Sequence, residues 1–158
     1  TGESVNLGVM DTLEQRVVYI HKYDSAYSLS LHSTLGRRNP LHSTSLGKAL
    51  MAWRSDEEIE ERIASMDFAP LAPRTICDPA RYREELRRAR AQGYAEEVEE
   101  SEAGVRCMAV PILDHAGKSI AAISVSFPLI RFDEARKPDY VRLLTEAGRS
   151  ASETLGHA

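Results

Sequence analysis

The chain has 158 residues, 42% of them hydrophobic, which suits one domain with a single core. Its formal net charge of −4 argues against a surface for duplex DNA, which would gather Lys and Arg against the phosphates. The two cysteines, Cys77 and Cys107, have no metal-ligand spacing, and no histidine sits in one either. With no signal peptide and no apolar run long enough to cross a bilayer, we expect a cytoplasmic protein without metal or cofactor.

The first half of the chain predicts strands followed by helices. Alternating apolar residues predict a β-hairpin over 5–9 and 16–23, and a third strand over 27–31. A loop over 36–40 then leads to a helix expected over 44–53. The chain begins at a threonine without an initiator Met, close to its first strand, so we expect an upstream part to be missing.

Capping residues mark the later helices. Ser55 and Glu58 form a capping box at the start of a second helix. A third helix is expected over 78–93, between an Asp-Pro start and a terminal glycine, and a last one begins near Pro138.

Strands fill the stretch between these last two helices. A strand near Tyr94 leads into an acidic loop, and a second hairpin is expected over 105–113 and 118–127. The order of strands, helices, strands and helix predicts an α+β fold on an antiparallel sheet of about six strands.

The second hairpin allows a geometric prediction. If its turn is centred on 115–116, Cys107 faces Ser124 and Val105 faces Ser126. Side chains alternate along strands, so Cys107, Ser124 and Ser126 share a small polar face, and the opposite face is apolar, with Met108, Ile123, Val125 and Phe127. The polar face could be the floor of a ligand site, or the serines could face water on an open sheet. A bulge near the turn would change this register.

A cluster of hydroxyl residues opens the first helix. Ser43, Thr44 and Ser45 can cap it, and the unpaired amides of such a first turn attract a carboxylate or phosphate. An ordinary cap that binds nothing is the alternative. The segment lacks the spacing of a nucleotide-binding loop, and Lys48 is expected to be solvated on the outer face of the helix.

The acidic run over 96–102 predicts a loop that is mostly solvated, in which one member could still point inward. Arg106, which follows it, could form a surface ion pair with one of these carboxylates or reach an anionic ligand. Tyr19, Tyr23 and Tyr27 could line the mouth of a site or fill the core.

Several separated motifs, in order, resemble the effector-binding domain of IclR-type transcriptional regulators: 41–49, 93–94, the acidic run, 104–107 and 123–126. The resemblance covers essentially the whole chain. Within that family, 18–27, 33–40 and 130–132 are most similar to the regulator of pectin and hexuronate breakdown, for which the implied effector is 2-keto-3-deoxygluconate.

The resemblance implies a GAF-like fold, an N-terminal winged helix-turn-helix domain outside this chain that carries DNA binding, and a homodimer or homotetramer. It also implies a small organic acid as ligand, bound through seven residues: Thr44, Ser45, Leu46, Glu97, Cys107, Ser124 and Ser126. Its carboxylate is expected at the amides of Ser45 and Leu46. Relatives often carry Asp at the position of Glu97, so the depth of the site could differ.

Two alternatives remain at this point. A GAF-like thiol enzyme would use Cys107, but it wants a partner base or resolving cysteine, and Cys77 lies in a Pro-rich connection, so we expect no enzyme. A dimerisation module without ligand is the other, and it would fill the space above the small residues with side chains.

Overall fold

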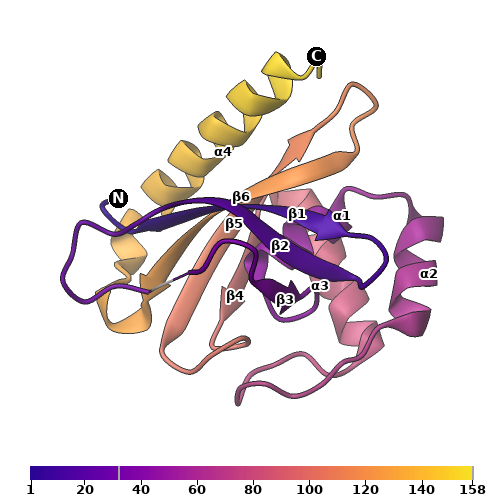
Figure 1. Cartoon of the computed structure of the whole chain (residues 1–158), viewed down its shortest axis with the longest axis horizontal. Helices are drawn as coiled ribbons and strands as arrows, with labels where there is room; N and C mark the ends of the chain where they lie inside the picture. The colour runs from indigo at the N-terminus through magenta and orange to yellow at the C-terminus, as the bar shows by residue number, and fades with distance from the viewer. Residues whose placement is uncertain (32, 158) are drawn as a thin grey trace.

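A computed structural model describes residues 1–31 and 33–157. It contains one antiparallel sheet in the order β3-β2-β1-β6-β5-β4 (Figure 1), which confirms the predicted α+β class and about six strands. The strands are β1 Ser4–Asp11, β2 Arg16–Tyr23, β3 Arg38–Pro40, β4 Ala95–Val98, β5 Val105–Leu113 and β6 Ser119–Pro128. The α-helices are α1 Ser45–Ala52, α2 Asp56–Ser65, α3 Pro79–Gln92 and α4 Lys137–Thr154, and the 3-10 turns η1 Leu129–Arg131 and η2 Glu134–Arg136 precede α4.

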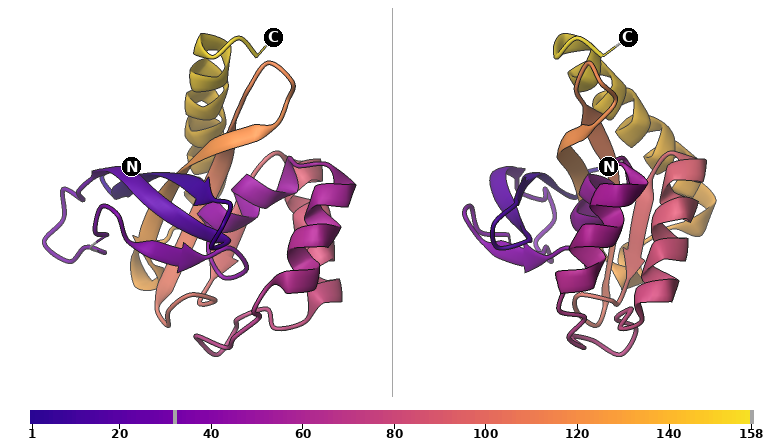
Figure 2. Two further views of the ribbon diagram at one scale, coloured as in Figure 1. Left: turned by 45° about the vertical axis from the view of Figure 1, so that its right-hand side comes forward. Right: turned by 90° about the vertical axis from the view of Figure 1, so that its right-hand side faces the viewer.

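Helices cover both faces of the sheet (Figure 2). Helix α1 packs on β5, β6 and β1, with α3 beside it, and α4 packs on the opposite face of β5 and β6. Alternation along the strands separates the two cores, since Ala109 belongs to the α1 side and Met108 to the α4 side. The predicted apolar face of the hairpin is therefore the face beneath α4.

The predicted helix caps are confirmed. Thr44 Oγ1 accepts from Gly47 N at 3.1 Å, and Ser55 Oγ accepts from Glu58 N at 3.2 Å. Gly93 ends α3 with a φ of 86°, the left-handed conformation that glycine adopts without strain. No helix in the described part of the chain is long and apolar enough to span a membrane.

The predicted third strand over 27–31 is wrong. Its apolar residues do not share a buried face, since Tyr27 is 46% and Leu29 is 58% exposed. The edge of β2 is instead covered by β3, after a turn at Gly36 with a φ of 79°. Gly36 N donates to Tyr19 O at 2.8 Å, so hydrogen bonds to β2 begin two residues before β3 itself.

The predicted register of the second hairpin is wrong by two residues. Cys107 lies opposite Ser126, not Ser124, and Val105 lies opposite Pro128. The loop joins Leu113 to Ser119, which moves the register by one residue, and a bulge then moves it by another. Because two single shifts restore the alternation, the prediction that Cys107, Ser124 and Ser126 share a face is confirmed.

Helix α4 approaches the sheet closely at Gly148. A Cβ atom there would lie 2.8 Å from Val110 Cγ2 and 2.9 Å from Pro111 O. One turn later, Ser152 Oγ accepts from Leu113 N at 2.9 Å. The glycine and the serine together bring the helix axis near the end of β5.

Candidate functional site

A row of polar side chains crosses four strands on the α1 side of the sheet. Glu97 on β4 pairs with Cys107 on β5, Cys107 with Ser126 on β6, and Ser126 with Ser4 on β1. The Cys107 thiol donates to Ser126 Oγ at 3.2 Å, and Asn6 Nδ2 donates to the same oxygen at 3.4 Å. These bonds hold the polar side chains in place on this face of the sheet.

A cavity of about 740 Å³ lies over this row and opens to solvent. It is bounded by the β2–β3 edge, the start of α1 and the loop after β4, and its polar lining includes Asn6, Tyr19, Arg37, Thr44, Cys107 and Ser126. Small-molecule sites usually have volumes of about 300–1,000 Å³. The cavity has room for a sugar-sized ligand.

The structure brings part of the predicted site to this cavity. Thr44, Cys107 and Ser126 line it. The other four predicted residues are at most 2% exposed and stand outside the described lining: Ser45, Leu46, Glu97 and Ser124. Ser124 lies one rung away from Ser126, opposite Ala109 and Asn6.

Glu97 reaches the cavity indirectly. Its carboxylate accepts from Ser101 Oγ at 2.8 Å and from Glu100 N at 2.9 Å, so it holds the loop that carries Ser101 into the lining. Burial raises the pKa of Glu97 although these hydrogen bonds oppose the shift. The loop, more than the carboxylate, faces the cavity.

Cys107 is a hydrogen-bond donor here. Burial raises the pKa of its thiol well above the usual range, and the neighbouring charge of Glu97 adds to the shift. A nucleophilic cysteine needs a lowered pKa, so this thiol stays protonated at neutral pH. The raised pKa and the bond from the thiol to Ser126 therefore favour ligand binding over thiol chemistry.

The start of α1 presents unpaired polar groups beside the cavity. The amides of Ser45 and Leu46 donate to no atom of the described residues, and the buried Ser43 Oγ also lacks a partner there. Gly47 allows the first turn of α1 to pack closely against the backbone of Leu41, because a Cβ at position 47 would lie 2.3 Å from Leu41 O. Thr44 Oγ1 donates to Pro40 O at 2.8 Å and fixes the turn.

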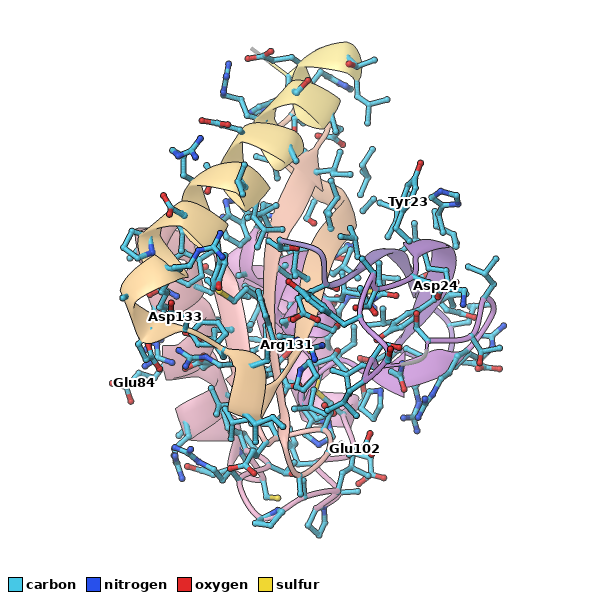
Figure 3. All side chains as sticks on the ribbon, turned by 90° about the vertical axis from the view of Figure 1, so that its left-hand side faces the viewer. Tyr23, Asp24, Glu84, Glu102, Arg131 and Asp133 are labelled. Atoms are coloured by element: carbon cyan, nitrogen blue, oxygen red, sulfur yellow. The ribbon has the colours of Figure 1, made fainter. Side chains whose placement is uncertain are left out.

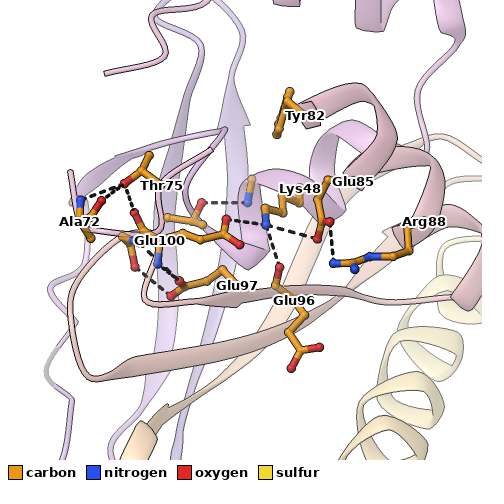
Figure 4. Close-up of polar contacts among 12 residues, drawn as sticks. Lys48, Ala72, Thr75, Tyr82, Glu85, Arg88, Glu96, Glu97 and Glu100 are labelled. Atoms are coloured by element: carbon orange, nitrogen blue, oxygen red, sulfur yellow. Dashed lines mark hydrogen bonds and ion pairs between the residues drawn. The ribbon is translucent and has the colours of Figure 1, made fainter. Parts of the chain in front are cut away.

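The prediction that Lys48 is solvated is wrong. Its side chain is fully buried, and its Nζ lies 2.6 Å from Glu100 Oε2 and 3.4 Å from Glu85 Oε1 (Figure 4). It also donates to the carbonyl oxygen of Glu96 at 2.8 Å. Helix α1 is buried on all sides, so it has no outer face on which a lysine could be solvated.

Glu100 is the second inward member of the acidic run. Burial raises its pKa to about 7, although Lys48 opposes the shift. Its carbonyl oxygen accepts from Thr75 Oγ1 at 2.6 Å, and the neighbouring Glu99 O accepts from Arg74 N at 3.3 Å. Two members of the acidic run, Glu97 and Glu100, are thus turned inward, where the sequence predicted a mostly solvated loop with one inward member; Glu102 is exposed, as predicted.

Arg106 forms an ion pair with the acidic run, as one of the two interpretations predicted. Its Nη2 lies 2.6 Å from Glu96 Oε1, and it also pairs with Glu134. The guanidinium stacks 3.6 Å from the ring centroid of Phe132, in the core beneath α4. It therefore faces away from the cavity, and the pair is largely buried, not superficial.

The three tyrosines have different surroundings. Tyr19 lines the cavity, and burial raises its pKa to about 12. Tyr23 is 70% exposed and points away from the body of the molecule (Figure 3). The ring of Tyr27 lies 4.4 Å from the guanidinium carbon of Arg131.

Comparison with known proteins places the chain in a family of bacterial transcriptional regulators. Residues 1–153 match the family model described as the C-terminal part of the bacterial transcriptional regulator IclR, and the chain belongs to this family. The relatives are regulators of transcription, not enzymes.

Within the family, the chain is similar to KdgR. It is 46% identical to KdgR of Dickeya chrysanthemi over 157 residues, which cover 99% of this chain and 51% of the relative. The chain thus spans about half the length of the curated relatives it matches.

Solved structures agree with this similarity. The C-terminal domain of Escherichia coli KdgR matches with a TM-score of 0.88 and 41% identity, covering 99% of this chain and 90% of that one. The inducer-binding domain of Acinetobacter PobR, a double mutant in complex with 3-hydroxybenzoic acid, matches with a TM-score of 0.85 and 30% identity, covering 96% and 89%.

Proposed function

We propose that this chain is the effector-sensing domain of a KdgR-like regulator that acts in the bacterial cytoplasm. It binds a small organic acid, either 2-keto-3-deoxygluconate or a related keto or sugar acid, and so controls DNA binding by an N-terminal domain outside this chain. The active assembly is a homodimer or homotetramer. The observation that carries the proposal is the open cavity above the hydrogen-bonded row from Glu97 to Ser126.

The chemistry of the walls supports an oxygen-rich ligand. The Cys107 thiol and the Ser126 hydroxyl bind its oxo or hydroxyl oxygens, with Ser124 behind them and Glu97 holding the adjacent loop. Thr44 caps the start of α1 at the edge of the cavity, and the amides of Ser45 and Leu46 behind it supply further donors. A relative that binds an aromatic acid supports the class of ligand.

The cavity also favours sensing over a dimerisation module without a ligand. Such a module would fill the space with side chains, because protein interiors are packed as densely as organic crystals. A volume of about 740 Å³ lined by hydroxyl, amide and guanidinium groups is instead suited to a polar guest.

Thermal unfolding against 2-keto-3-deoxygluconate, pyruvate, glyoxylate and gluconate tests the proposal. A ligand at a hundredfold excess over its Kd adds about 2.7 kcal/mol, and the melting temperature should rise. Ser126→Ala should reduce the rise, because it removes a lining hydroxyl, and Ser150→Ala on the exposed face of α4 should leave it unchanged. If none of the four acids shifts the transition, the sensor proposal fails.

Control of DNA binding requires that the effector distinguish two arrangements of the regulator. In the full-length protein, the acid should bind with different affinity in the presence and absence of operator DNA. Equal affinities would mean that no coupling free energy exists between the two sites.

A further inference from the structure

We propose that Arg37 forms a carboxylate subsite at the β2–β3 edge of the cavity, and that it binds the acid group of the effector. The inference rests on the proposed function and adds to it the orientation of the ligand. Its basis is a guanidinium that has no partner among the described residues and that stands on the cavity side of a fixed segment of backbone.

The backbone of Arg37 is anchored on both sides. Tyr19 N donates to Arg37 O at 3.2 Å, and Arg37 N donates to Thr34 O at 3.0 Å. Asn39, two residues later, pairs with Val17, whose side chain is buried under α1. By alternation, Arg37 and Asn39 stand on the cavity side of the sheet, and both line the cavity.

The side chain of Arg37 has no ion pair or hydrogen bond within the described residues. The adjacent Arg38 is on the other face, where it pairs with Asp11 and lies 2.9 Å from Glu14 Oε2. A guanidinium that is backbone-anchored, unpaired and turned to a cavity is available to an anion.

The charge of the lining also favours an anion. Among the described lining residues, Arg16 and Arg37 are the cations, and Glu102 is the single carboxylate. Glu97 is buried beside the floor and outside the described lining, and burial raises its pKa and so opposes its negative charge. The cavity therefore has an excess of positive charge toward the β2–β3 edge.

Tyr19 completes the subsite. It lines the cavity together with Arg37 and Cys107, and its backbone N–H holds the backbone of Arg37. With its pKa raised to about 12, it keeps its proton at neutral pH and can donate to a carboxylate. A planar guanidinium binds a carboxylate through two parallel hydrogen bonds, which also fixes its direction.

The ligand is then oriented with its carboxylate at Arg37 and its remaining oxygens toward the row of Cys107 and Ser126. This orientation differs from the one expected from the sequence, in which the carboxylate binds the amides of Ser45 and Leu46; those two residues stand outside the described lining. Those amides remain donors for an oxo or hydroxyl group.

Isothermal titration calorimetry on the intact chain tests this orientation. The tightest binder among 2-keto-3-deoxygluconate, pyruvate, glyoxylate and gluconate is titrated together with its uncharged methyl ester. Arg37→Met should weaken binding of the acid at least tenfold, and Arg37→Lys should weaken it less, since it keeps the charge and loses the fork. Arg38→Met, which removes the same charge one residue away on the other face, should change the affinity less than twofold.

The ester separates the carboxylate from the rest of the ligand. It should bind the wild type as weakly as the acid binds Arg37→Met, and Arg37→Met should not weaken it further. If the acid binds Arg37→Met as tightly as the wild type, or the ester binds the wild type as tightly as the acid, the subsite is overturned and the sensor proposal stands. If no acid binds the wild type, both are overturned.

Discussion

A single buried ammonium joins three separate segments of this domain. Lys48 on α1 contacts Glu85 on α3 and Glu100 in the loop after β4, and that loop carries Ser101 into the cavity lining. Removing one partner of a buried ion pair leaves an uncompensated charge in a medium of low dielectric constant. The lysine therefore supports both the fold and the wall of the candidate site.

Lys48→Met should lower the free energy of unfolding by about 3–5 kcal/mol, because it leaves the buried carboxylates without their cation. Urea denaturation measures the loss. Arg149→Met is the matched control, since its pair with Glu153 is exposed and should be worth about 1 kcal/mol or less. The double variant Lys48→Met, Glu100→Gln should recover part of the lost free energy of unfolding. If Lys48→Met lowers this free energy no more than Arg149→Met does, the buried ion pair does not stabilise the fold as argued.

Sequence patterns predicted single residues well where the cause was local. The caps at Thr44 and Ser55 depend on bonds within three residues, and both are confirmed. The burial of Lys48 depends on Glu85 and Glu100, which are distant in the chain and come together only in the fold. No local pattern distinguishes such a lysine from a solvated one.

At the scale of elements, the contact of α4 with β5 depends on the absence of a side chain at Gly148. The helix comes close enough that a Cβ would overlap with Val110 and with the carbonyl oxygen of Pro111. The apolar core beneath α4 includes Met108, Val125 and Phe127, so this contact determines how the helix covers that face.

Gly148→Ala should destabilise the domain by about 1–3 kcal/mol, the usual cost of overpacking. In an exposed helix interior, alanine would instead stabilise by up to about 1 kcal/mol relative to glycine. The sign of the change, measured by chemical denaturation, thus reports whether the close contact exists. Ser150→Ala, exposed on the same helix, should have an effect within about 0.5 kcal/mol.

Helices were easier to predict than strand pairing, for a physical reason. A helix is specified by nearby residues, whereas pairing depends on the loop that joins two strands. The five-residue loop and the bulge next to Leu113 each moved the register by one residue, and only their sum preserved the polar face. The pattern over 27–31 had the period of a strand without a partner in the sheet, and it formed none.

At the scale of the whole molecule, the stability should depend on pH through Glu100. Its pKa in the folded state is about 7, above the ordinary value of 4.5, because burial outweighs the attraction of Lys48. The folded state therefore binds the proton more tightly than the unfolded state. The stabilisation from this proton is fully present below about pH 4.5 and is lost as the pH rises through about 7.

Glu100→Gln should flatten this dependence. Between about pH 4.5 and pH 7, the wild type should lose stability relative to the variant as the pH rises. Lys48, Glu85 and Glu97 surround the carboxylate in both proteins, so the difference between the two unfolding curves isolates Glu100. Glu153→Gln, an exposed residue near the end of α4, is the control, and its free energy of unfolding should follow the same pH dependence as that of the wild type. If Glu100→Gln also follows it, the pKa of Glu100 is not raised in the folded state.

The cavity as a whole was less predictable than its floor. Cys107 and Ser126 lie on one hairpin, where alternation placed them together. Tyr19, Asn6 and Arg37 reach the same cavity from distant strands, and the sequence contains no pattern that pairs β1 with β6. The sequence does not show which charged side chains find a partner, and only the structure shows that Arg37 has none among residues 1–31 and 33–157.

The pairing of β1 with β6 has a consequence for folding during synthesis. The Asn6–Ser126 bond closes a loop of 120 residues, and contacts between such distant residues slow folding. As the chain leaves the ribosome, the first hairpin emerges long before its partner strand, with one edge open to other chains. Ser126 of β6 is part of the cavity lining, so a nascent copy of this domain cannot bind a ligand in the cavity before β6 has left the ribosome.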